Sequence, residues 1–110
     1  MAYQDIDSIF TALQIRNTSL QTSSIAISGE YIAKTILLDN GHNQIVTLQL
    51  QGSDNQTDWF DVGAAIDIPA TTKTYETLTD FFPYYRATAQ CSVAPASGDL
   101  DVRIIKAHNT

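Results

Sequence analysis

The spacing of apolar residues along the chain changes once, near residue 24. Before that point, four apolar residues recur at the i, i+3, i+4 and i+7 positions, which place them on one stripe of a helix. They are Ile6, Ile9, Phe10 and Leu13. Asp5 stands before the stripe, where an aspartate can cap the first helical turn. The pattern predicts a short helix over 5–14, which must dock on the protein itself or on a neighbouring subunit because it is too short to be stable alone.

From residue 24 onward, apolar and polar residues alternate with a period of two, which is typical of half-buried strands. The predicted strands are 24–28, 31–39, 44–52, 59–68, 72–78, 84–93 and 100–107. Segments rich in Gly, Pro, Asn, Asp and Ser separate them, as expected for turns. The most specific turn signal is "DNGH" at 39–42, since Asn-Gly supplies the two positive φ angles of a type I′ hairpin.

Short strands at regular spacing, without helices between them, predict an all-β fold. We expect a single antiparallel β-sandwich of the jelly-roll or immunoglobulin-like kind, with about seven or eight strands. The 110 residues fit one domain. The predicted organisation is an N-terminal arm with its short helix and linker over 1–23, followed by the sandwich over 24–110.

The alternation also predicts which side chains face the core, because successive strand residues point to opposite faces. The predicted inward sets are Val46, Leu48 and Leu50; Phe60, Val62, Ala64, Ile66 and Ile68; Tyr85, Ala87, Ala89, Cys91 and Val93; and Leu100, Val102 and Ile104. The opposite faces also carry apolar residues, among them Ile45, Trp59, Ile105 and either Leu37 or its even-numbered neighbours. Some of this outer surface should therefore be covered, either by the N-terminal segment or by another subunit.

The loop 53–58 has the composition of a hairpin tip, and Trp59 stands at its mouth. If Phe60 points inward, alternation directs Trp59 outward for binding, unless a bulge turns it back into the core. Asp54, Asn55, Asp58 and Asp61 carry oxygens suited to calcium, but their spacing lacks the glycine and terminal glutamate of a calcium loop. We therefore expect no metal site here.

The charge pattern disfavours binding to nucleic acid. The formal net charge is −6, and the six basic residues are scattered singly, whereas a phosphate backbone requires concentrated positive charge. No basic start followed by an apolar run marks a secretory signal, and no stretch approaches the roughly 20 apolar residues that cross a bilayer. The single cysteine, Cys91, is expected to be a small core residue.

No catalytic constellation is visible in the sequence. The two histidines, His42 and His108, belong to no metal-ligand cluster and to no nucleophile motif, and both are expected to be solvated polar residues. No carboxylate pair is marked by its surroundings as an acid and a base. We expect a protein that is not an enzyme and that uses no cofactor.

Three segments together resemble the small β-sandwich structural proteins of tailed bacteriophage virions, a group that includes capsid decoration proteins and neck or tail accessory proteins. These segments are "VTLQLQGSDNQTDWFDVG", "FFPYYRATAQCSV" and "GDLDVRIIKA". The resemblance covers roughly residues 30–107 and implies a virion protein assembled in the bacterial host cytoplasm. It also implies that Arg86 pairs with a carboxylate such as Asp61 or Asp99.

Two classes of function follow from these expectations. The first is a capsid decoration protein that forms a homo-oligomer and binds the major capsid protein or another virion protein through Ile6, Ile9, Phe10 and Leu13. A tail or neck component with the same fold is an alternative. The second class is a carbohydrate-binding or receptor-binding module. Its platform would consist of Trp59, Tyr84 and Tyr31, with hydrogen-bonding partners at Asp54, Asn55 and Asp58.

Overall fold

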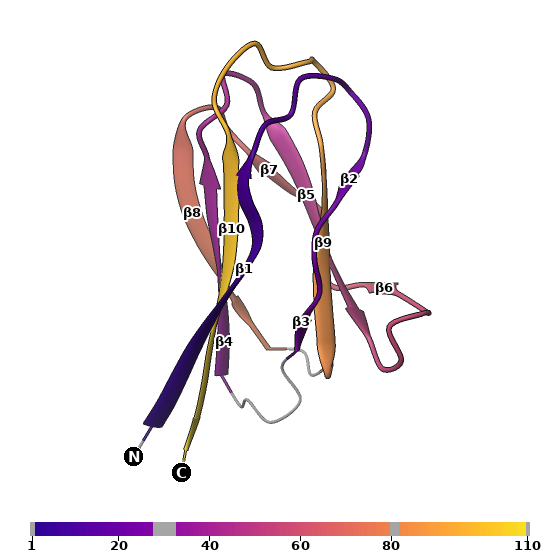
Figure 1. Ribbon diagram of the computed structural model, residues 1–110, viewed down its shortest axis with the longest axis vertical. Helices are drawn as coiled ribbons and strands as arrows, with labels where there is room; N and C mark the ends of the chain where they lie inside the picture. Colours follow the sequence, from indigo (N-terminus) through magenta and orange to yellow (C-terminus); the bar gives the residue numbers. More distant parts are fainter. Residues whose placement is uncertain (1, 28–32, 80–81, 110) are drawn as a thin grey trace.

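The protein consists of two packed β-sheets (Figure 1). The computed structural model describes residues 2–27, 33–79 and 82–109. The strands are β1 Ala2–Leu13, β2 Gln21–Thr22, β3 Ala26–Ile27, β4 Ala33–Asn40, β5 Val46–Ser53, β6 Phe60–Asp61, β7 Ile66–Ile68, β8 Thr72–Leu78, β9 Tyr84–Gln90 and β10 Leu100–Asn109. The predicted starting point of one strand, Tyr31, lies outside the described residues. The all-β sandwich expected from the alternation is confirmed.

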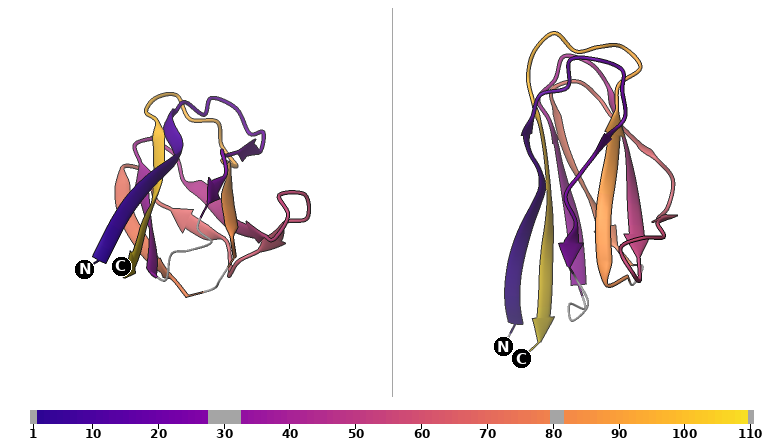
Figure 2. Two further views of the ribbon diagram at one scale, coloured as in Figure 1. Left: turned by 60° about the horizontal axis from the view of Figure 1, so that its bottom comes forward. Right: turned by 45° about the vertical axis from the view of Figure 1, so that its right-hand side comes forward.

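The order of the strands is that of a jelly roll. Sheet A runs β1-β10-β4-β8, and sheet B runs β2-β9-β5-β6. Strand β3 also pairs with β9, and β7 also pairs with β5, so β2–β3 and β6–β7 are two interrupted strands along the edges of sheet B. Figure 2 shows the two sheets facing each other as separate layers. Of the two predicted sandwich types, the structure has the jelly-roll order, in which the first and last strands are neighbours.

The helix predicted over 5–14 is wrong, because this segment forms most of strand β1. Two irregularities interrupt its pairing with β10: Ser8 pairs with Arg103, Phe10 with Val102, and Leu13 with Leu100. Each extra residue shifts the side-chain alternation by one position. Ile9 and Phe10 are therefore both buried and Leu13 packs against the core, while Ile6 stays 56% exposed. The apolar residues of a strand with two bulges can therefore recur at the same spacing as those of a helix.

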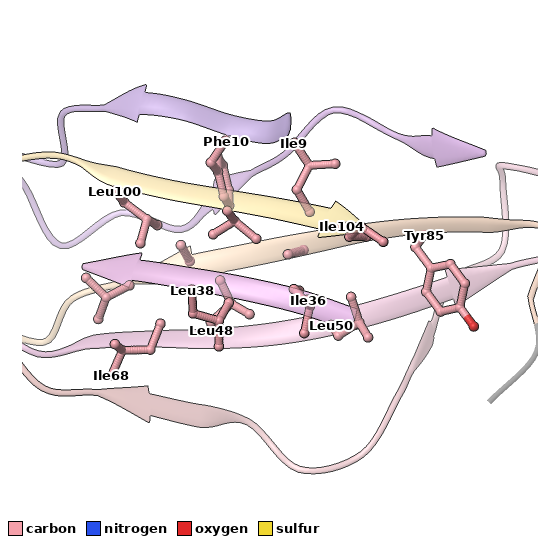
Figure 3. Packing of buried hydrophobic residues seen from close by; sticks show 14 of the residues in the cluster. Ile9, Phe10, Ile36, Leu38, Leu48, Leu50, Ile68, Tyr85, Leu100 and Ile104 are labelled. Atoms are coloured by element: carbon pink, nitrogen blue, oxygen red, sulfur yellow. The ribbon is translucent and has the colours of Figure 1, made fainter. Parts of the chain in front are cut away.

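The core lies between the sheets, and several of its members are labelled in Figure 3. The inward sets predicted for β5, β9 and β10 are buried, apart from Val93, which follows the end of β9 and is 55% exposed. The set predicted for 59–68 is only partly confirmed: Ile68 is buried, whereas Phe60 is 57% exposed. This segment departs from the prediction because the strand is interrupted between β6 and β7.

The predicted hairpin at "DNGH" is wrong, because β4 and β5 belong to different sheets. Neither Asn40 nor Gly41 has a positive φ. Instead, Asn40 is fully buried, and its Nδ2 lies 3.0 Å from the backbone oxygens of Gln44, Ile68 and Pro69. Its Oδ1 accepts a hydrogen bond from the His42 backbone amide at 2.9 Å. The Asn40 side chain therefore links, by hydrogen bonds, the loops that close one end of the sandwich.

His42, expected to be solvated, is also fully buried at this end. Its Nδ1 lies 3.1 Å from the Ser97 carbonyl oxygen, and the amide of the neighbouring Gly41 donates a hydrogen bond to the Asp99 carbonyl oxygen. The side chain of His42 is thus part of the packing of the loops. The sequence pattern missed it because His42 lies between strands, where alternation does not predict orientation.

The other end of the sandwich interior contains charged residues. Asp5 pairs with Lys106, and Lys106 pairs with Lys34, so these residues form one row across the inner face of sheet A. Both lysines are at most 5% exposed. Lys106 Nζ lies 2.6 Å from Asp7 Oδ2 and 2.7 Å from the Ile27 carbonyl oxygen. The Lys34 ammonium lies 5.5 Å from the centre of the Tyr85 ring.

Candidate interaction surfaces

One candidate surface surrounds Trp59, on the outer side of sheet B. The guanidinium carbon of Arg86, on β9, lies 4.3 Å from the centre of the Trp59 ring. Arg86 Nε donates a 2.8 Å hydrogen bond to Gln51 Oε1, and Gln51 Nε2 donates a 3.1 Å bond to Asp61 Oδ1. Arg86 is therefore linked to Asp61 through Gln51 rather than by the direct ion pair expected from the sequence.

Trp59 is half-buried, so neither alternative from the sequence describes it fully. Arg86 covers one face of the ring by a cation–π contact. Tyr84 is also half-buried and pairs with Ser53, next to the loop. The structure thus brings Trp59, Tyr84 and the loop 53–58 to one corner of sheet B, whereas Tyr31 lies outside the described residues.

Hydrogen bonds within the chain organise the loop itself. Ser53 Oγ accepts hydrogen bonds from the amides of Asn55 and Gln56, and Asn55 Oδ1 accepts bonds from those of Thr57 and Asp58. Asn55 Nδ2 donates to Asp58 Oδ2 at 3.0 Å. Within the described residues, no three His, Cys, Asp or Glu side chains gather as metal ligands would. The loop is therefore held in shape by its own polar side chains, and Asp54 is exposed beside them.

The contact between Arg86 and Trp59 gives a testable prediction. Arg86→Gln removes the cation from the ring and is expected to shift Trp59 emission to longer wavelength, with increased quenching by acrylamide. The loss in the free energy of unfolding should be about 1 kcal/mol, as for a partly exposed cation–π pair. Trp59 is the only tryptophan, so the fluorescence reports this site alone. Arg103→Gln, on sheet A, is the control; an equal change in emission in both variants would contradict the assignment.

A second candidate surface is the outer face of sheet A. Ile6 pairs with Ile105 there, and Leu37 pairs with Tyr75 in the next row on the same face. The two apolar pairs are diagonal neighbours, because Ile105 itself pairs with Thr35 and Leu37 with Arg103. We call Ile6, Leu37, Tyr75 and Ile105 the outer-face patch. Ile6 is 56% and Tyr75 67% exposed, while the other two are half-buried. Arg103 pairs with Leu37 and helps to line a shallow groove of about 230 Å³ beside it.

The N-terminal segment does not cover this outer face, so that alternative from the sequence is wrong. Strand β1 lies within sheet A and itself contributes Ile6 to the patch. Of the four residues expected to bind a partner, Ile9 and Phe10 lie in the protein's own core and Leu13 packs against it. Only Ile6 is exposed to a partner. Tyr75 was not predicted as a surface residue. Alternation within 72–78 nevertheless places Tyr75 and Glu76 on opposite faces of their strand.

Cys91 lies in the core, as its position in the alternating segment predicted. Burial raises the pKa of its thiol, which keeps the thiol protonated at neutral pH. Such a buried, protonated thiol is a poor nucleophile. Separately, the described residues contain no helix with the length and apolar character needed to cross a bilayer.

No protein-family model matches the chain, and no curated protein matches its sequence. SPBc2 prophage-derived protein YomS has a similar structure, with a TM-score of 0.65 and 12% identity, covering 98% of this chain and 96% of that one. PBSX exported protein XepA has a TM-score of 0.66 and 17% identity, covering 96% of this chain and 37% of XepA.

A protein of Bacillus endospore appendages, described as a family of disulfide-linked pili, is a further structural neighbour. Its TM-score is 0.59 at 15% identity, covering 98% of this chain and 89% of that one. At these identities the likeness concerns the fold alone. The two-sheet β-sandwich seen here is therefore shared, over nearly the whole chain, with proteins of very different sequence.

Proposed function

We propose that this chain is a non-catalytic structural protein of a bacteriophage particle that binds the outer surface of the capsid shell as a decoration protein. The observation that carries the proposal is the outer-face patch, which no described part of the chain covers. Exposed apolar side chains gathered on one face of an otherwise polar sheet are typical of a surface that binds another protein. Partners would be the major capsid protein or another virion protein, together with further copies of this chain.

The chemistry of the patch supports a protein partner. Tyrosine and arginine are enriched among the residues that dominate binding energies, and Tyr75 and Arg103 both border Leu37 on this face. Burying apolar surface contributes roughly 25 cal/mol per Å². Many weak copies of such a contact, repeated over a symmetric shell, add up to a substantial stabilisation of the particle.

The structural neighbours also support the proposal. YomS, named as a prophage-derived protein, shares the fold over nearly its full length, and the endospore appendage protein belongs to a family that forms pili. The net charge of −6 suits a position outside the shell, away from packaged DNA. A protein of this kind would be made in the cytoplasm of the bacterial host and would reach its final place in the virion.

Two other roles compete with capsid decoration. A tail or neck accessory protein would use the same apolar patch against a different partner. A carbohydrate-binding or receptor-binding module would instead use the corner of sheet B, where Trp59 and Tyr84 lie beside the loop 53–58. Aromatic rings with neighbouring amide and carboxylate groups are suited to sugars. However, the guanidinium group of Arg86 already covers one face of the Trp59 ring.

Cosedimentation of the purified chain with phage shells tests the proposal. The double variant Ile6→Asp/Tyr75→Asp places two charges in the patch and is expected to weaken binding by at least about tenfold, since each buried, unpaired charge is costly. Ile45→Asp is the matched control, because Ile45 is 53% exposed but lies outside the patch. Equal binding by the double variant and the wild type would contradict the role of the patch.

A further inference from the structure

The sandwich is open along one side, between the edge strands of the two sheets. Sheet A ends at β8, which pairs only with β4 among the described strands. The facing edge of sheet B is interrupted, because β6 ends at Asp61 and β7 begins at Ile66 (Figure 1). The segment 62–65 between them forms no strand. The interior is therefore less covered here than elsewhere.

A groove of about 390 Å³ lies in this opening. Aliphatic side chains of the core form its floor and walls, among them Ile36, Leu48, Leu50 and Leu78. The small residues 63–65 form part of its rim, and a Cβ added at Gly63 would meet no atom within 4 Å. The groove is therefore apolar, with an open rim of small side chains.

Glu76 is the one charged residue among the described residues that line the groove. It pairs with Ile36, whose side chain is buried between the sheets, so Glu76 lies on the inner face of β8. Its side chain is nevertheless exposed and has no hydrogen bond or ion pair within the described residues. Lys34 lies one row further along, with its ammonium over the Tyr85 ring. The groove thus presents a carboxylate without a cation in its lining.

The backbone of β8 is also available beside the groove. In an antiparallel pair, every second residue directs its N–H and C=O groups away from the neighbouring strand. Over Thr72–Leu78 these outward groups have no strand partner among the described residues. Exposed edges of this kind bind extended segments of other proteins, with backbone hydrogen bonds giving affinity and alternate side chains giving specificity.

We propose that β8 binds an extended segment of a partner protein by strand addition, and that this segment places a lysine or arginine opposite Glu76 between aliphatic residues that fill the groove. The alternation of a strand directs every second side chain of the added segment toward the groove. Its inward pattern is therefore aliphatic, basic, aliphatic. The groove lies on the inner side of β8, whereas Tyr75 of the outer-face patch lies on the outer side of the same strand.

A second copy of the chain does not satisfy this chemistry through its own β8. The inward residues of β8 include no basic side chain, and antiparallel pairing that sets the two Glu76 residues directly opposite each other would be destabilising. An inward-pointing charge is also a known protection of an edge against self-association. Glu76 therefore disfavours pairing between copies and favours a basic strand.

Two synthetic seven-residue peptides test the proposal. One has the sequence Thr-Val-Thr-Lys-Thr-Val-Thr, and the other has Glu in place of Lys. Binding is followed by chemical-shift changes of backbone amides. The Lys peptide is expected to shift the amides of β8 and to bind the wild type at least about tenfold more tightly than the Glu peptide, through a charge pair beside an apolar groove. Glu76→Lys should reverse this order, and Glu76→Gln should abolish the preference.

Two controls separate this mode from simple charge attraction. Asp67→Lys makes the same charge change on the outer side of sheet B and should leave the preference for the Lys peptide unchanged. A Lys peptide with N-methylated amides on its pairing edge should lose binding, because it cannot form the backbone ladder. Equal affinity of Glu76→Lys for both peptides, shifts confined to other strands, or undiminished binding of the N-methylated peptide would each overturn the proposal.

Discussion

Gly98→Ala is expected to lower the free energy of unfolding by about 3 kcal/mol, combining backbone strain with overpacking. Gly98 has a φ of +86°, which an alanine adopts only with strain. A Cβ at this position would also overlap the Gly41 carbonyl oxygen, so the loops at this end would have to move apart. That movement would disturb the hydrogen bonds around Asn40 and His42. Urea denaturation measures the loss.

Gly63→Ala is the matched control for this variant. Gly63 has a similar φ of +69°, but a Cβ there meets no atom within 4 Å. It should cost only about 1 kcal/mol, from the left-handed backbone conformation alone. The difference between the two losses in the free energy of unfolding measures the effect of the close approach between the loops. Equal losses would show that Gly98 and Gly41 do not pack as described.

Asp7→Asn is expected to lower the free energy of unfolding by about 2 kcal/mol, because it leaves the buried ammonium of Lys106 without its closest carboxylate. The side chain of Lys106 is 4% exposed, whereas that of Asp7 is 32% exposed. This partial exposure places the expected loss below that of a fully buried pair. Strand β1 should also be destabilised locally, and faster hydrogen exchange of the amides of residues 2–8 measures that effect.

Asp5→Asn is the control for the charge at this site. Asp5 Oδ2 lies 3.9 Å from Lys106 Nζ, and the Asp5 side chain is 47% exposed. The expected loss is at most about 0.5 kcal/mol, as for an exposed ion pair. An equal loss in the free energy of unfolding for Asp7→Asn and Asp5→Asn would contradict the prediction. It would show that the 2.6 Å contact between Lys106 and Asp7 does not stabilise β1 in the sheet more than the exposed pair does.

The sequence predicted those parts of the fold in which alternation is regular. The strand predicted over 72–78 has the observed bounds of β8, and the inward residues of β5 and β10 were identified from parity. The prediction from alternation was wrong in β1, because two bulges change which residues face the core. One bulge lies between Ser8 and Phe10, and the other lies between Phe10 and Leu13. A bulge leaves no unambiguous mark in a single sequence, so helical spacing was the simpler interpretation.

The sequence indicated less about the surfaces. Alternation already places Lys106 on the same face as Ile104, so the burial of this lysine could have been predicted from the sequence. The orientation of Trp59 depends on Arg86 and Gln51, which come from two other strands. The groove beside β8 depends on where the strand predicted over 59–68 is interrupted. Such contacts between distant segments cannot be read from local patterns.

Locating the chain in images of the native particle tests the central claim most directly. Antibody or tag labelling of particles from cells that carry this gene should place the chain on the outside of the capsid shell, in repeated copies related by the shell's symmetry. Label confined to the tail or neck would support the accessory role instead. Intact particles that lack the chain entirely would contradict a structural role in the virion.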